Sequence, residues 1–159
     1  MKLVARLAVP LLALAALAGC AHGPSTAAIV GERVISDAEL TEIVDSCRAA
    51  GLKPNRSKVL SLMVFGKIFE GAARRLGQSL DEAALQAMKG DPGVASLAGT
   101  PCEKPFKDGF RVQIGKKVLD PGSVKASIPA VEINPRYGAW DPEQGFDPMG
   151  GSISVEAKS

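Results

Sequence analysis

The chain is poor in residues that catalysis commonly uses. It contains one histidine in 159 residues, and this residue, His22, lies in a short polar segment two positions after Cys20. A catalytic triad or a metal site needs a histidine that neighbouring groups hold in place, and such a segment does not provide this. The sequence also lacks a glycine-rich phosphate-binding loop, a CxxC redox pair and a hydrolase signature. We therefore expect no catalytic residues, no metal site and no cofactor.

A long apolar run is missing as well. The most apolar stretch, residues 7–17, has about half of the roughly 20 residues that a transmembrane helix needs, so a retained membrane helix is the weaker interpretation. It follows Lys2 and Arg6 and ends at Leu17-Ala18-Gly19-Cys20, which is typical of a secretory signal. This motif resembles a bacterial lipobox, which implies cleavage after residue 19 and a diacylglycerol on Cys20. We expect a lipid anchor on the extracytoplasmic side of a membrane of the cell envelope; a free thiol is the alternative.

The mature chain has no excess of basic over acidic residues. The full sequence has 19 Lys and Arg against 17 Asp and Glu. Lys2 and Arg6 leave with the signal peptide, so 17 basic residues remain against 17 acidic ones. Nucleic-acid binding normally needs a basic patch that displaces counterions from phosphates, and here the two signs alternate along the chain. We therefore exclude nucleic acid as a partner.

Cysteine is scarce, and we expect the three residues present to serve two roles, lipid attachment and one disulfide. If Cys20 carries the lipid, Cys47 and Cys102 remain in an oxidising compartment, and we expect a disulfide between them. It would close a loop of about 55 residues and stabilise the fold by roughly 4 kcal/mol. Two buried free thiols are the alternative, because the sequence does not reveal whether the Cα atoms come within bridging distance.

The mature chain has room for one domain with a modest core. We assign residues 20–27 to a tether, residues 28–141 to the domain and residues 142–159 to a flexible tail, with poor order from Asp141 onward. Residues 28–30 and 33–35 flank Gly31-Glu32, which predicts a β-hairpin with a type II′ turn.

Capping signals predict three helices after the hairpin. Ser36 with Glu39 forms a capping box for a helix that Gly51 ends, with Leu40, Ile43, Val44 and Cys47 facing the core. Asn55 caps a long central helix over residues 56–76, whose two apolar stripes predict two packing partners. Ser79 with Glu82 predicts a short helix over residues 80–89, with Leu85 and Met88 facing inward.

The second half of the chain is harder to assign. Three prolines and two glycines predict a loop over residues 91–105, which carries Cys102. Apolar residues four apart favour a helix over residues 106–119, whereas the alternation of Phe110, Val112 and Ile114 leaves a strand as the alternative. A break at Asp120-Pro121-Gly122 precedes an expected strand over residues 130–133.

Two segments together resemble a known family. Ala28-Ile29-Val30-Gly31-Glu32-Arg33-Val34-Ile35 leads into the capped helix, and Val131-Glu132-Ile133-Asn134-Pro135-Arg136-Tyr137-Gly138-Ala139-Trp140-Asp141 brings the chain back. Residues 27–141 thus resemble the N-terminal domain of SurA and PrsA-like extracytoplasmic foldases. The resemblance implies a mostly α domain with a small β-sheet, in which the first strand pairs with a late strand and the helices form an apolar cradle. It implies no prolyl isomerase activity, because a parvulin domain does not fit.

The resemblance implies chaperone-like binding of unfolded or secreted polypeptides without chemistry. The candidate client-binding residues are large apolar, aromatic or cationic: Met63, Phe65, Phe69, Met88, Arg136, Tyr137 and Trp140. Each has a structural alternative: the helix residues can be ordinary core, and Tyr137 and Trp140 can anchor the returning chain. An accessory subunit that binds one folded envelope partner and a carrier of a small apolar ligand remain alternative functions.

Overall fold

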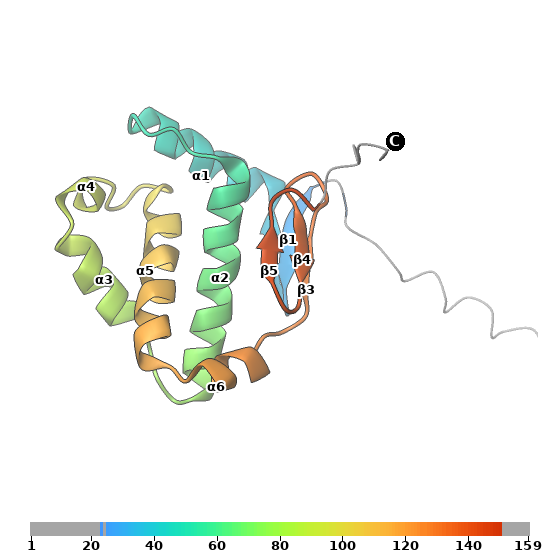
Figure 1. The fold of residues 1–159 in the computed structure, drawn as a ribbon. Coiled ribbons are helices and arrows are strands. Elements are labelled where there is room, and N and C mark those ends of the chain that lie inside the picture. Colours follow the sequence, from blue (N-terminus) through green and yellow to red (C-terminus); the bar gives the residue numbers. More distant parts are fainter. Residues whose placement is uncertain (1–22, 24, 151–159) are drawn as a thin grey trace, which may run out of the picture.

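The computed structural model describes residues 23 and 25–150, and the lipobox, Cys20 and residues 151–159 lie outside this range. The described part is a mostly helical α+β domain with two small antiparallel sheets (Figure 1). Its elements in chain order are β1 (Thr26–Val30), β2 (Arg33–Ser36), α1 (Asp37–Ala49), α2 (Arg56–Arg75), α3 (Asp81–Lys89), α4 (Pro92–Ala95), α5 (Glu103–Val118), α6 (Pro121–Ala126), β3 (Val131–Ile133), β4 (Ala139–Asp141) and β5 (Gly145–Asp147).

The larger sheet joins the two ends of the domain in the order β2-β1-β3. Gly31 takes a φ of 59° in the turn between β1 and β2, as the first central residue of the expected hairpin requires. β1 also pairs antiparallel with β3, with Ile29 opposite Glu132. Asn134 fixes this junction, because its side-chain amide donates to the carbonyl oxygen of Thr26 at 2.8 Å. The expected pairing of an early and a late strand is confirmed.

Side-chain caps begin the first two helices where the sequence predicts them. The Ser36 hydroxyl accepts a hydrogen bond from the Glu39 backbone N–H at 3.0 Å, and the Asn55 side chain accepts one from Lys58 N–H at 3.0 Å. α1 buries the four predicted residues, Leu40, Ile43, Val44 and Cys47. α2 lies between α5 and the sheets, so its two apolar stripes have the two expected packing partners (Figure 1).

The third helix differs from its prediction. α3 begins at Asp81, and Ser79 accepts a hydrogen bond only from the Asp81 backbone N–H, so the predicted capping box with Glu82 is wrong. Ala84 and Met88 face the core, whereas Leu85 remains 36% exposed. Ala84 and Met88 lie four residues apart and form the inward face of α3, so a small residue rather than Leu85 takes the inward position beside Met88.

The second half of the chain is more ordered than expected. Residues 106–119 lie mostly in α5, which confirms the helix and excludes the strand. Asp91 and Asp120, each followed by proline, cap the short helices α4 and α6. The predicted loop at residue 91 and the predicted break at residue 120 are therefore helix starts. Proline suits the first turn of a helix because that turn has no partner for its N–H groups.

Part of the predicted tail forms structure. Residues 139–147 contain the β4–β5 hairpin, in which Trp140 lies opposite Phe146. The expected poor order from Asp141 onward is therefore wrong for this hairpin. The Trp140 ring packs against Phe65 of α2, with ring centroids 5.7 Å apart, and this contact holds the hairpin on the core.

Candidate functional site

The helix residues predicted to bind clients do not form an open surface. Met63 is 1% exposed, and Phe69 and Met88 are also buried. Phe65 is partly buried beneath Trp140. α2 and α3 turn these side chains toward α5 and the sheets, so the expected exposed apolar surface is replaced by a closed core.

The segment over residues 131–141, which brings the chain back to the first strand, is anchored to the helices through Tyr137. Tyr137 is 8% exposed, and its hydroxyl donates to the Asp37 carboxylate and accepts a hydrogen bond from Arg56 at 3.2 Å. The Arg56 guanidinium also lies 5.6 Å from the centroid of the Tyr137 ring, and that of Arg136 lies 5.8 Å from it. These contacts tie the end of β3 to the first turns of α1 and α2, so Tyr137 is not available to a partner.

The predicted disulfide is present and supports an opening beside it. Cys47 of α1 is bonded to Cys102, the residue before α5, with Cα atoms 4.9 Å apart. The Cys102 backbone N–H also donates to the Ser46 hydroxyl at 3.2 Å. Because this link joins the end of α1 to the start of α5, it fixes two walls of the adjoining opening.

This opening is an apolar groove of about 380 Å³. Leu52 and Leu62 on its walls are 40% and 37% exposed, although both are large and apolar. Lys53 and Lys58 are the two cations that line it. Its remaining lining is largely apolar: Cys47, Pro54, Asn55, Val59, Pro105 and Phe106. We call this feature the apolar groove; Leu62 belongs to the predicted stripe of α2, but the periodicity alone did not separate it from the buried residues.

A network of charges lies between α2, α3 and α5. Asp108 is fully buried and accepts a hydrogen bond from Arg111 at 2.6 Å. Burial raises the pKa of Asp108, although the Arg111 guanidinium opposes this. Arg111 also pairs with Asp81. Burial opposes ionisation of Asp81, but the hydrogen bond from Arg111 and the charges of Arg111 and Lys107 together lower its pKa. Glu70, 3.9 Å from Arg111, completes the network.

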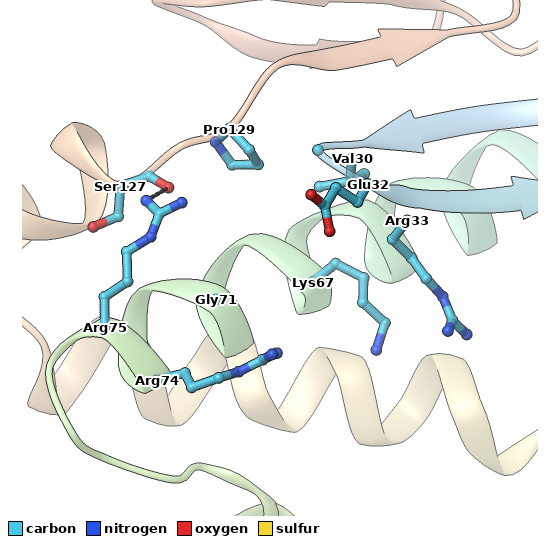
Figure 2. A pocket seen from close by; sticks show the side chains of 10 residues that line it. Val30, Glu32, Arg33, Lys67, Gly71, Arg74, Arg75, Ser127 and Pro129 are labelled. Carbon is cyan, nitrogen blue, oxygen red and sulfur yellow. Dashed lines mark hydrogen bonds between the residues drawn. The ribbon is translucent and has the colours of Figure 1, made fainter.

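A second, polar opening lies on the other side of α2 (Figure 2). It has a volume of about 620 Å³, and four of its lining residues are cations: Arg33, Lys67, Arg74 and Arg75. The other lining residues are Val30, Gly31, Glu32, Gly71, Ser127 and Pro129. We call this feature the basic cleft. The alternation of charge along the sequence does not indicate this cleft. The spacing of residues 67, 71, 74 and 75, however, places them on one face of the predicted helix.

The described residues bring together no nucleophile, base and orienting group in either opening. His22 and Cys20 lie outside the described residues. Within residues 23 and 25–150, no three His, Cys, Asp or Glu side chains are grouped to hold a metal ion. In the same part of the chain, no helix has the length and apolar character needed to cross a membrane. No family model, curated protein or solved structure matches the chain.

Proposed function

We propose that this protein is a lipid-anchored, extracytoplasmic polypeptide-binding protein of the chaperone kind, without catalytic activity. The observation that carries the proposal is the apolar groove, where two leucines remain more than a third exposed at the edge of a well-packed core. Clustered apolar side chains in an open cavity are typical of binding sites for apolar groups. The groove replaces the buried Met63, Phe69 and Met88 as the proposed binding surface.

The size and charge of the groove define the client. A volume of about 380 Å³ suits a few side chains of an extended segment rather than a folded surface. Lys53 and Lys58 are exposed and have no carboxylate partner among the described residues. A preferred client segment therefore combines two or three apolar residues with a neighbouring Asp or Glu, because the lysines attract that charge.

Topology and location also support the proposal. Pairing of β1 with β3 around an intervening set of helices is what the resemblance to SurA-type N-terminal domains implies. The Cys47–Cys102 disulfide suits an oxidising compartment. An anchor on Cys20 would raise the local concentration of the domain near emerging chains, so that weak binding suffices.

An aggregation assay tests the proposed function. The mature chain, residues 20–159 with Cys20→Ser to prevent lipid attachment, is mixed with a chemically denatured reporter enzyme, and light scattering is followed after dilution. We expect suppression of aggregation by this protein and a loss of most of that suppression with Leu62→Gln. Leu85→Gln is the matched control, because Leu85 is also helical and 36% exposed but lies on α3, outside the groove.

Two results would decide against this function. If the protein leaves aggregation unchanged at a tenfold molar excess, it does not bind unfolded chains under these conditions and the proposal is wrong. If crosslinking in the envelope returns one stoichiometric folded partner instead of many clients, the protein is an accessory subunit. The closed core around Met63 is the observation that favours this second candidate.

A further inference from the structure

We infer that the basic cleft binds the phosphate group of an organic phosphate. Cations from separate elements line one side of it: Arg33 comes from β2, and Lys67, Arg74 and Arg75 come from α2. Figure 2 shows the side chains of Arg33, Lys67 and Arg74 extending to the same side of α2, while Arg75 reaches toward Ser127. This inference is independent of the apolar groove and of the proposed chaperone function.

The cations of the cleft exceed the carboxylates that balance them. Lys67 and Arg74 both bind Glu70, at 2.6 and 3.2 Å. Arg75 donates to the carbonyl oxygen of Ser127 at 2.6 Å, and within the described residues neither Arg75 nor Arg33 has a carboxylate partner. Glu70 and Glu32 therefore leave a surplus of positive charge. A phosphate supplies the missing negative charge and several acceptor oxygens, which arginine binds well.

Helix electrostatics account for only part of this cluster. Arg74 and Arg75 lie in the last turn of α2, where cations interact favourably with the helix dipole and the final carbonyl groups. Arg33 lies on β2, is exposed and gains nothing from that dipole. The helix dipole therefore does not explain why Arg33 lines the cleft, whereas an anionic ligand does.

Gly71 provides a separate observation. This residue lies inside α2, where glycine lowers helix propensity relative to alanine. A Cβ atom on Gly71 would meet nothing within 4 Å, so packing does not require glycine there, and its φ is not positive. Gly66, in the same helix, is required by its close contact with Asp108. The glycine at position 71 instead keeps the floor of the cleft open, as a ligand would need.

The dimensions of the cleft argue for a phosphate attached to an organic body. A cavity of about 620 Å³ lies within the range of small-molecule sites and exceeds the volume of a single phosphate. Val30 and Pro129 line the side opposite Lys67 and Arg74, as the labelled side chains in Figure 2 show. An organic phosphate places its charged group on the arginines and its neutral body against these apolar side chains.

Calorimetry on the mature chain, residues 20–159 with Cys20→Ser, tests the inference with two phosphate sources. Glycerol 3-phosphate is the soluble probe, and vesicles of phosphatidic acid in phosphatidylcholine present the same phosphomonoester as a lipid headgroup. We expect saturable binding to at least one probe, with affinity that falls as salt rises. Binding to the soluble probe identifies a free organic phosphate as sufficient; binding to the vesicles alone identifies a lipid headgroup.

Matched variants locate the binding. Arg33→Gln and Arg75→Gln each lower the affinity by about tenfold, the value of one charge-assisted hydrogen bond at an open site. Gly71→Leu fills the floor of the cleft, so it abolishes binding while the protein melts at or above the wild-type temperature. Lys117→Gln, which removes an exposed cation of α5 outside the cleft, changes the affinity by less than twofold.

Three results would overturn the inference. The first is no binding to either probe at low salt. The second is a loss of affinity with Lys117→Gln as large as that with Arg33→Gln, which would mean general electrostatic attraction. The third is wild-type affinity in a folded Gly71→Leu variant. If Gly71→Leu does not fold, the comparison of Arg33→Gln with Lys117→Gln decides the question alone.

Discussion

Gly66 of α2 packs directly against the side chain of Asp108 of α5, and no side chain fits at position 66 without displacing that carboxylate. The absence of a Cβ lets the two longest helices approach each other and buries Asp108 completely. Gly115 of α5 plays the same role against the Phe69 ring. The core of this domain therefore depends on glycines that helix propensity alone would disfavour.

The two glycines of α2 give opposite results on substitution by alanine. Gly66→Ala forces a methyl group into the Asp108 carboxylate, and we expect the free energy of unfolding to fall by about 2 kcal/mol. Gly71→Ala meets no neighbour, so the gain in helix propensity raises that free energy by about 0.5–1 kcal/mol. Urea unfolding of both variants measures the difference. Equal effects at the two positions would contradict the described packing.

Loss of the disulfide destabilises the whole domain. The Cys47–Cys102 bond spans 55 residues and connects α1 to the start of α5. Its removal by Cys47→Ser together with Cys102→Ser lowers the free energy of unfolding by about 4 kcal/mol, because the unfolded chain gains freedom. Thermal unfolding of the oxidised, reduced and double-variant proteins checks this. Identical melting temperatures with and without reductant would show that the bond is not formed.

The ion pair between Asp81 and Arg111 makes stability depend on pH. The pKa of Asp81 lies below its ordinary value of 3.8, since the opposing effect of burial is outweighed by the Arg111 hydrogen bond and the nearby positive charges together. The folded state thus binds fewer protons at this group, so the stabilisation is present above pH 3.8 and is lost as the pH falls through the lowered pKa. We expect Asp81→Asn to cost about 1 kcal/mol at neutral pH.

The pH dependence of that difference is the measurement. Urea unfolding of wild type and Asp81→Asn is compared at neutral pH and below pH 3.8, and the difference should shrink on acidification. Asp108 acts with the opposite sign: its pKa is raised, so its ionisation reduces stability as the pH rises through that value. Both proteins keep Asp108, but Asp108 shares Arg111 with Asp81, so the comparison measures the two carboxylates as one network. A difference that grows on acidification would be inconsistent with the ion pair.

Tyr137 is predicted to act as a structural anchor. Tyr137→Phe removes the hydroxyl that bonds Asp37 and Arg56 while it keeps the ring, and we expect a loss of about 1 kcal/mol. Client binding should remain within twofold of wild type, because the apolar groove does not include this residue. Unfolding and peptide-binding measurements on one preparation separate the two roles. Unchanged stability with weakened binding would make Tyr137 a recognition residue instead.

Local signals predicted much of the fold. The caps at Ser36 and Asn55, the turn at Gly31 and the late strand at residues 131–133 depend on residues close in sequence, and each is present. The short helices α4 and α6 were missed because proline was interpreted as a break, although its position after Asp91 and Asp120 suits a helix start. Leu85 was placed inward on its apolar character, but Ala84, four residues before Met88, has the inward position.

The candidate site was less predictable, because it depends on which helix faces become covered. The periodicity of α2 marks Leu62, Phe65 and Phe69 equally as apolar. In the fold, the β4–β5 hairpin partly covers Phe65, α5 and Leu80 bury Phe69, and Leu62 alone remains open beside the groove. The sequence predicted poor order from Asp141 onward, so it did not predict the hairpin that covers Phe65.

The central claim is that the apolar groove binds extended apolar segments, and a methyl NMR titration tests it most directly. The mature chain, residues 20–159 with Cys20→Ser, is labelled at Leu and Val methyls, and an unfolded peptide with three apolar residues flanked by Asp is added. We expect the methyl resonances of Leu52, Val59 and Leu62 to shift first and to saturate together as peptide is added. The methyl resonances of Leu85 should stay unchanged. Shifts centred on Leu85, or no shifts at millimolar peptide, would contradict the central claim.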